Sequence, residues 1–265
     1  MLTQTQVGEF RARGFLKGGA VLDSDRVEEL RKDLDRVIRE GNSASGKPVR
    51  ICNLSGKDDT PVWQVVNIWM ASDPFRDLIS HRKIVDEIAQ LLEAKQLRVW
   101  HDQIQFKPPN HGGVNHWHQD GPYWPILTPK NLVTAWTALD DVDESNGCMS
   151  MVPGSHLWGN HIRLLEGIED FQQMPTNLAG HKVEVVRCPV RKGEVHYHHA
   201  MTWHGSHGNA SNRPRRAIAI HYMAENVCYD AGGEHIMKRF VEVEDGAPLA
   251  GETFPLVWEA ERVHA

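Results

Sequence analysis

The sequence predicts a mainly β protein with flanking helices, in which an antiparallel sandwich or barrel is surrounded by helices within one domain. Two observations lead to this prediction. Helical periodicity is confined to the first third of the chain, and from about residue 96 short apolar segments alternate with turn-forming residues. Strands that follow one another without helices between them usually pair antiparallel. The 265 residues are enough to bury a sizeable core.

Two helices are expected in the first third. The first is capped by Ser24 or Asp25 and ends near Gly41, and the second begins at Asp73-Pro74. Their apolar residues recur at helical spacing: Val27, Leu30, Leu34, Val37 and Ile38 in the first, and Phe75, Leu78, Ile79, Ile84, Val85, Ile88, Leu91 and Leu92 in the second. Residues 41–48 (GNSASGKP) predict a loop, because glycine, serine and proline dominate them.

Short strands are expected after residue 96. They are 97–107, 131–139, 148–152, 182–187, 194–198 and 217–223. The connection 153–180 is long for such a fold, and long connections are usually functional or loosely ordered. We expect this segment and the C-terminal tail to contribute the walls or lid of a pocket.

Charge and composition argue against several classes of partner. A net charge of -6 disfavours broad binding to nucleic acids or anionic membranes, which requires a basic surface. No apolar run reaches transmembrane length, and the N-terminal stretch lacks the hydrophobic centre of a signal peptide, so a cytoplasmic protein is expected. The four cysteines are far apart, which predicts reduced thiols rather than a disulfide framework.

Histidine is frequent, and its 16 residues gather at 101–118 and 196–207. In the segment HWHQD, His118 and Asp120 share one face of an extended strand, and His116 could join them. An imidazole and a carboxylate with open positions suit non-haem iron(II), whereas three nitrogens and one oxygen suit zinc. A distant histidine must complete the iron site, and spacing does not choose among His196, His198, His199, His204 and His207.

Three segments match a known family in order and spacing. They are KPPNHGGVNHWHQD at 107–120, TAWTALDDVDESNGCMSMVPGSH at 134–156 and HGSHGNASNRPRRA at 204–217. On these segments the chain resembles the phytanoyl-CoA dioxygenase family of iron(II)- and 2-oxoglutarate-dependent oxygenases. The resemblance implies a double-stranded β-helix (jelly-roll, cupin-like) core at 96–225. It also implies a mostly helical part at 1–95 packed on the barrel and a C-terminal extension at 226–265, within one oxygenase domain of 1–265.

The resemblance also implies a metal site and its cofactors. The family's HxD motif falls on His118 and Asp120, and the histidine of its HGS motif falls on His204. His116 is then not a metal ligand. It is expected near the metal site, in the substrate pocket or in solvent. The implied cofactors are Fe(II), 2-oxoglutarate and dioxygen, with succinate and carbon dioxide as products of the co-substrate. Because halogenating relatives carry a small residue where this chain has Asp120, hydroxylation is favoured.

Co-substrate contacts follow from the same resemblance. Arg215 stands where the family places the arginine that binds the far carboxylate of 2-oxoglutarate, and Ser206 could add a hydroxyl donor. Strand alternation sends Arg216 to the opposite face, toward solvent. Trp136 falls where the family has a tryptophan beside the co-substrate. Three further candidates for this role are Gln103, Gln119 and Asn67.

The substrate is expected to be a small molecule, such as a metabolite or a natural-product intermediate. Candidate contacts are His116, Tyr123, Trp124 and Trp158, with Trp117 and Trp203 as further aromatic candidates. No dense patch of lysine and arginine is visible for the phosphates of coenzyme A. Two alternatives remain open: a zinc-dependent hydrolase that uses HxHxD with His116 as a ligand, and a non-catalytic metal-binding jelly-roll protein.

Overall fold

The computed structural model describes residues 1–41 and 48–260 and shows a mainly antiparallel β protein with flanking helices. The loop expected at 41–48 falls mostly on residues 42–47, which lie outside the described residues. The longer helices are α1 (Gln4–Arg13), α2 (Ser24–Glu40), α3 (Asp73–Leu78), α4 (Arg82–Leu92) and α5 (Ile162–Glu166). No helix in the described ranges is both long and apolar enough to cross a membrane.

The larger sheet has eight strands in the order β1-β12-β7-β14-β4-β3-β2, with β16 added beside β4. Its strands are β1 (Phe15–Ala20), β2 (Arg50–Asn53), β3 (Trp63–Val66), β4 (Gln96–Lys107), β7 (Leu132–Ala138), β12 (Glu194–His199), β14 (Arg215–Ala224) and β16 (Leu256–Glu259). All neighbours in this sheet run antiparallel. The strands expected at 97–107, 131–139, 194–198 and 217–223 correspond to its centre.

The smaller sheet has four strands in the order β11-β8-β13-β5. They are β5 (Asn115–His118), β8 (Met149–Met151), β11 (Val186–Cys188) and β13 (His204–Ser206). Two short hairpins complete the β structure: β6 (Leu127–Thr128) with β15 (Cys228–Tyr229), and β9 (Asn177–Leu178) with β10 (His181–Lys182). Two facing antiparallel sheets of this kind form a double-stranded β-helix, so the predicted fold class is confirmed.

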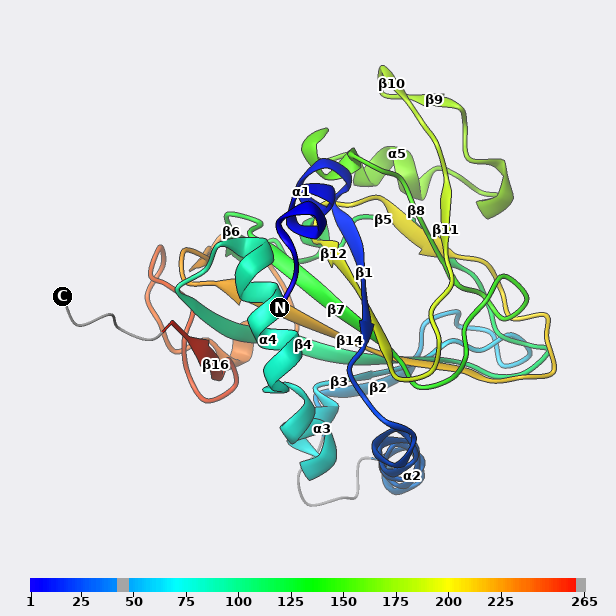
Figure 1. Cartoon of the computed structure of the whole chain (residues 1–265), viewed down its shortest axis with the longest axis horizontal. Coiled ribbons are helices and arrows are strands. Elements are labelled where there is room, and N and C mark those ends of the chain that lie inside the picture. The colour runs from blue at the N-terminus through cyan, green and yellow to red at the C-terminus, as the bar shows by residue number, and fades with distance from the viewer. Residues whose placement is uncertain (42–47, 261–265) are drawn as a thin grey trace.

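The two faces of the larger sheet have different neighbours: helices cover one face, and the smaller sheet lies against the other. One face carries Ile218, Ile220 and Tyr222, which pack under α2 and α4 in the largest apolar cluster. Figure 1 shows α3 and α4 lying against this face. Because side chains alternate along a strand, Ala217, Ala219 and His221 point the other way, toward the smaller sheet. The interior between the two sheets is where the metal-binding motifs meet.

The described residues of the N-terminal third contain four α-helices and, beside them, three short strands that the sequence did not predict. Strands β1, β2 and β3 join the larger sheet, and their short length hides them in the sequence pattern. The cap of α2 is Asp23 rather than Ser24 or Asp25, since its side chain accepts a hydrogen bond from the amide of Arg26. All four cysteines are free, as expected.

The helix expected from residue 73 to residue 92 is two helices, α3 and α4. The chain tightens between them, because the amide of His81 bonds to the carbonyl of Leu78 and both the amide and the hydroxyl of Ser80 bond to the carbonyl of Asp77. These tighter bonds compete with the α-helical ladder. The strand expected at 182–187 is likewise split between β10 and β11.

Candidate metal centre and co-substrate pocket

Pairing of β5 with β13 brings the two halves of the metal motif together. His118 and His204 are direct partners across the two strands, although 86 positions separate them, and their ring centroids lie 4.1 Å apart. Asp120 follows β5 by two residues and is 6% exposed. Ligand atoms of His118, Asp120 and His204 all lie within 4.8 Å of one another.

Backbone carbonyls orient both imidazoles for a metal ion. The Nδ1 atom of His118 lies 2.7 Å from the carbonyl oxygen of His116, and that of His204 lies 2.9 Å from the carbonyl oxygen of Thr202. A carbonyl only accepts, so each Nδ1 must carry the hydrogen, and the neutral ring can offer its Nε2 lone pair to a metal. Such a bond on the far nitrogen is the usual support of metal-binding histidines. The residues present therefore fit a divalent metal.

Asp120 is an anion held by its neighbours. Its Oδ1 lies 3.6 Å from Nε2 of His118 and 3.7 Å from Nε2 of His204, while its Oδ2 lies 3.3 Å from Nε2 of His198. Thr134 Oγ1 also lies 3.4 Å from Oδ2. Burial alone would raise the pKa of Asp120, but the imidazoles of His204, His118 and His198 outweigh it and hold the pKa well below the usual range. Oδ1 thus faces the metal position, while Oδ2 is held by hydrogen bonds with His198 and Thr134.

The donor set indicates which metal the site can hold. Two imidazoles and one carboxylate leave open coordination positions, an arrangement typical of non-haem iron(II) oxygenases. Within residues 1–41 and 48–260 this is the one group of histidine, cysteine, aspartate or glutamate residues arranged for a metal. His116 is exposed and lies outside that group. The zinc-hydrolase alternative with HxHxD therefore lacks its second histidine.

Arg215 lies in the same small cavity as the metal ligands and is fully buried. Its guanidinium stacks on Trp136 at 4.8 Å, and its Nη1 and Nη2 lie 3.5 Å from Gln105 Oε1 and Ser206 Oγ. Burial lowers the pKa of Arg215 only to about 10, so the side chain is charged at neutral pH. The structure thus brings Arg215, Trp136, Ser206 and the metal ligands together.

Two buried donors in this cavity have no partner in the described part of the chain: Arg215 Nε and Trp136 Nε1. No carboxylate there lies within ion-pair distance of Arg215 either. Buried donors and buried charges are normally satisfied. A bound carboxylate would satisfy both, which is the fit expected for the far end of 2-oxoglutarate. The cavity itself is small, about 20 Å³.

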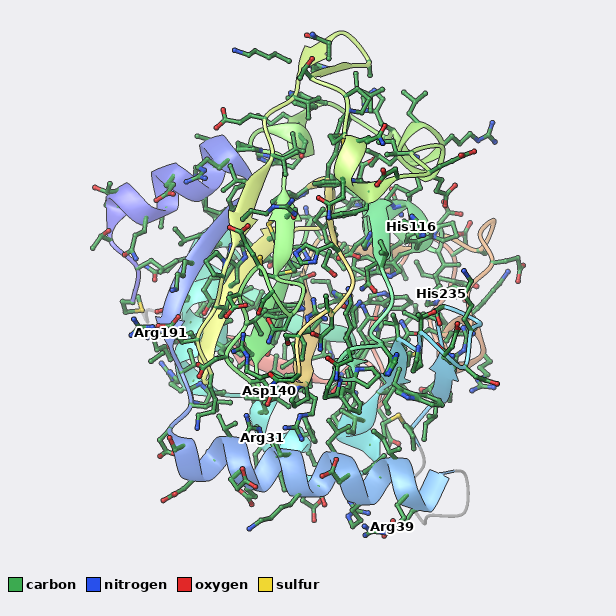
Figure 2. The ribbon with its side chains drawn as sticks, turned by 90° about the vertical axis from the view of Figure 1, so that its right-hand side faces the viewer. Arg31, Arg39, His116, Asp140, Arg191 and His235 are labelled. Carbon is green, nitrogen blue, oxygen red and sulfur yellow. The ribbon has the colours of Figure 1, made fainter. Side chains whose placement is uncertain are left out.

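Arg216 points away from the cavity, as strand alternation predicts, but it does not face free solvent. Its guanidinium makes two hydrogen bonds to Asp140, at 2.9 and 3.0 Å. Asp140 also accepts a bond from Arg31 of α2, at 2.5 Å. Figure 2 shows Arg31 reaching from α2 toward Asp140. Arg216 is therefore part of a connection between the sheet and a helix.

Two of the expected co-substrate residues lie elsewhere. Gln119 is buried, and its amide donates to the carbonyls of Gly159 and Met201 and accepts from the amide of His161. These bonds consume its polar atoms and turn it away from the metal ligands, because adjacent residues of a strand face opposite ways. Asn67 accepts bonds from the amide of Asp102 and the indole of Trp69. Both side chains hold the backbone, and neither lines the cavity.

A larger chamber adjoins the metal site. It has a volume of about 590 Å³ and shares Gln103, Gln105, Asn115, His118 and Asp120 with the inner cavity. Tyr123, Trp124 and His116 line it, and so do Trp117, Glu166 of α5 and residues 234–236 of the C-terminal part. Figure 2 shows His116 and His235 on the same side of the molecule. Trp158 and Trp203 pack against each other instead, with Trp158 stacked on His181, and do not line the chamber.

Sequence reasoning missed two residues that support the site. His198 was one of five candidates for a metal ligand, and the structure places it beside Oδ2 of Asp120 instead. Lys107 lies at the end of β4, fully buried, with its ammonium on Ser206 and His207. Its place in the KPP segment was a signal, but only the pairing of distant strands shows what it touches.

Known proteins resemble this chain over nearly its whole length. Phytanoyl-CoA dioxygenase of mouse peroxisomes is 26% identical over 267 residues, covering 92% of this chain and 76% of the relative. The crystal structure of SnoK, a non-heme alpha-ketoglutarate-dependent carbocyclase from nogalamycin biosynthesis, is 29% identical, with a TM-score of 0.78 and 97% of each chain covered. SnoN, an epimerase of the same kind and pathway, is 25% identical at a TM-score of 0.78, covering 97% of this chain and 98% of its own.

The family model of phytanoyl-CoA dioxygenase matches residues 10–217, a range that includes the metal-binding cluster and Arg215. Because that match spans most of the sequence, this chain belongs to the phytanoyl-CoA dioxygenase family.

Proposed function

We propose that the protein is an iron(II)- and 2-oxoglutarate-dependent dioxygenase that hydroxylates a small molecule and releases succinate and carbon dioxide. One observation carries the proposal: the cluster of His118, Asp120 and His204 shares a cavity with the buried, carboxylate-free guanidinium of Arg215. An iron site and a carboxylate site side by side match the two ends of a 2-oxo dicarboxylate. The solved relatives named above as alpha-ketoglutarate-dependent support the same assignment.

Each group has a role in this assignment. His118, Asp120 and His204 would hold iron(II) and leave open positions, and the bound iron would supply oxidation of the substrate by dioxygen coupled to decarboxylation of 2-oxoglutarate. Arg215 would pair with the far carboxylate through its planar fork of donors. Trp136 stacks on that guanidinium and restricts its movement. His198 and Thr134 hold Oδ2 of Asp120, so that Oδ1 stays directed at the metal.

The chamber supports a small-molecule substrate. Its volume of about 590 Å³ falls within the range of roughly 300–1,000 Å³ that is usual for drug-sized ligands. Tyr123, Trp124 and Ile236 supply apolar surface, whereas Arg50 is the one lysine or arginine among the residues that line it. A coenzyme A thioester carries several phosphate charges, which one exposed arginine would match poorly. We therefore favour a metabolite or natural-product intermediate over an acyl-CoA.

A coupled assay tests the proposal. Protein loaded with iron(II) without oxygen is mixed with 2-oxoglutarate, aerated buffer and a panel of metabolites, and succinate is measured. We expect succinate in the presence of iron but not zinc, and a product that gains one oxygen atom. Zinc-dependent hydrolysis without succinate would overturn the proposal. A product with an unchanged oxygen count, formed together with succinate, would retain the oxygenase assignment and reject hydroxylation.

A further inference from the structure

Lys107 is a buried cation without a charged partner. The side chain is 0% exposed, and no carboxylate in the described ranges lies within ion-pair distance of it. Its ammonium donates to Ser206 Oγ at 2.7 Å, to the carbonyl of His207 at 2.7 Å and to the carbonyl of Ser206 at 3.2 Å. Burial and the nearby guanidinium of Arg215 lower the pKa of Lys107 well below its usual range, whereas the three acceptors around Nζ favour the charged form. A purely structural role in packing would not require the charge.

The lysine does not reach the ligand cavities itself. It lines neither the inner cavity nor the larger chamber. Its stem is enclosed, since a Cβ on Gly112 would lie 2.5 Å from Cβ of Lys107, and the Asn209 amide donates to the Lys107 carbonyl at 3.3 Å. What the ammonium touches is β13 and the residue after it, and of these contacts only Ser206 also lines the inner cavity. The hydrogen-bonded route from the ammonium to a ligand in the inner cavity therefore runs through Ser206.

The direction of the Ser206 hydroxyl follows from its two neighbours. Nζ of Lys107 lies beside three acceptors, which match the three donors of an ammonium. An ammonium has no lone pair, so in this form Ser206 Oγ accepts from Lys107 and cannot give its hydrogen back. Arg215, whose Nη2 lies 3.5 Å from the same oxygen, is also a donor only. The hydroxyl hydrogen is thus excluded from both cations and is free to point into the cavity that Ser206 and Arg215 line.

We propose that Lys107 is a positioning residue that makes Ser206 a fixed hydrogen-bond donor to the far carboxylate of 2-oxoglutarate, beside the guanidinium of Arg215. This inference rests on the proposed function, since it concerns the same co-substrate. Without the Lys107 ammonium, the Ser206 hydroxyl would be free to turn toward other acceptors. Lys107 would then set the affinity for the dicarboxylate and leave the metal-binding end of the molecule unaffected.

Two probes isolate this effect: 2-oxoglutarate and 2-oxovalerate. They share the 2-oxo acid end, but 2-oxovalerate has a methyl group where 2-oxoglutarate has the far carboxylate. Binding is measured calorimetrically with full-length protein and Mn(II) in place of iron, so that no turnover occurs. In Lys107→Met the Kd for 2-oxoglutarate should rise about 10- to 100-fold, the range for a lost hydrogen bond to a charged group, while the Kd for 2-oxovalerate changes less than about twofold.

A double-mutant cycle separates positioning from structural support. If Lys107 acts through Ser206, then Ser206→Ala combined with Lys107→Met should bind 2-oxoglutarate within about threefold of the weaker single variant. Independent structural damage would multiply the two effects and would also weaken 2-oxovalerate. Lys130→Met is the matched control, because this lysine is partly buried and donates only to the carbonyls of Trp124 and Leu127. It should leave 2-oxoglutarate binding unchanged.

A second variant covers the case in which Lys107→Met does not fold. Lys107→Gln keeps polar contacts to the carbonyls, but its amide oxygen can accept the Ser206 hydroxyl and draw the hydrogen away from the cavity. It should weaken 2-oxoglutarate and spare 2-oxovalerate. Unchanged 2-oxoglutarate affinity in either folded variant, or multiplicative effects in the cycle, would overturn the positioning role alone. If the wild-type protein binds neither probe with Mn(II), the proposed function fails as well.

Discussion

At the scale of single residues, the direction of each imidazole is decided by the backbone. His118 and His204 each give their Nδ1 hydrogen to a carbonyl two residues earlier in the chain, at His116 and Thr202. The remaining nitrogens converge on Oδ1 of Asp120. The geometry is thus set by hydrogen bonds that exist without a metal, which reduces the reorganisation that metal binding requires.

The metal ligands can be distinguished from their histidine neighbour by mutation. His118→Ala, Asp120→Ala and His204→Ala should each abolish iron binding and 2-oxoglutarate turnover, because three ligands are the minimum for this type of site. His116→Ala should keep both, since its side chain is exposed and only its carbonyl supports His118. Iron content after dialysis gives the comparison. Equal loss of iron in His116→Ala and His118→Ala would show that the ligands are assigned wrongly.

Removing His198, which supports Asp120, should weaken iron binding less than removing a metal ligand does. His198→Ala should lower iron affinity about 10- to 100-fold without abolishing it, the usual cost of removing a group that orients a metal ligand. His198→Gln, whose amide can donate to Oδ2, should recover part of the loss. Competition with a calibrated chelator measures the affinities. Complete loss of bound iron in His198→Ala would instead make His198 a ligand.

Arg215 should control co-substrate affinity. Removing one partner of a buried charge pair costs about 2–5 kcal/mol, so Arg215→Ala should raise the 2-oxoglutarate KM roughly 30- to several-thousand-fold with iron affinity nearly intact. Arg215→Lys should recover only part, because an ammonium lacks the planar fork. Arg216→Ala is the control on the opposite face. If Arg216→Ala alone raised KM, the faces of β14 would be assigned the wrong way round.

At the scale of elements, β14 shows how one strand serves two purposes. Arg215 and the residues that alternate with it face the metal site, while Arg216, Ile218 and Ile220 face the helices. Asp140, just after β7, joins the outer face to α2 by accepting hydrogen bonds from both Arg216 and Arg31. This connection ties the helical layer to the strand that carries Arg215.

Stability should depend strongly on that connection. Asp140 is 6% exposed, and Asp140→Ala would leave two largely buried guanidinium groups without their anion. Breaking a buried pair in this way costs about 3–5 kcal/mol of unfolding free energy. Asp143→Ala is a suitable control, since the Asp143–Arg213 pair is exposed and worth about 1 kcal/mol or less. Urea unfolding measures the unfolding free energy of both variants. Similar losses in Asp140→Ala and Asp143→Ala would contradict the burial argument.

At the scale of the whole molecule, several buried histidines make stability depend on pH. Burial lowers the pKa of His196 to about 3 and that of His221 to about 4. An unfolded histidine titrates near 6.5, so below that pH the unfolded chain binds protons that the folded chain does not. Stability is therefore unaffected by these groups above pH 6.5 and is lost as pH falls toward the folded pKa values.

Each such histidine should contribute a slope of about 1.4 kcal/mol per pH unit between roughly pH 6 and pH 4. Replacing His196 tests this, because the ring is buried and its Nδ1 has no partner in the described part of the chain. His196→Leu should make the loss of unfolding free energy shallower by about one proton. His111→Leu, at an exposed position, is the control. The unfolding free energy is measured with urea at several pH values, with a chelator present. If its slope against pH were the same in His196→Leu and in the wild type, the argument would be contradicted.

The sequence alone determined much of the local structure and the motif residues. Apolar spacing predicted α2, and the alternation of short apolar segments with turns predicted β4, β7, β12 and β14, because these patterns reflect one buried face per element. His118, Asp120, His204 and Arg215 were predicted through the resemblance of their motifs to those of a known family. Local patterns also misled, since Gln119 lies within the HQD motif but its amide holds backbone groups of distant segments.

Only the tertiary structure decided which side chains share a cavity. Pairing of β5 with β13 places His118 beside His204, and the approach of β4 to β13 puts Lys107 on a serine 99 positions away. Among the five candidate histidines, spacing could not separate His198 from His204, although one faces Oδ2 of Asp120 and the other Oδ1. The physical reason is that a strand fixes only which of two faces a residue takes, while the partner across that face depends on register and sheet order.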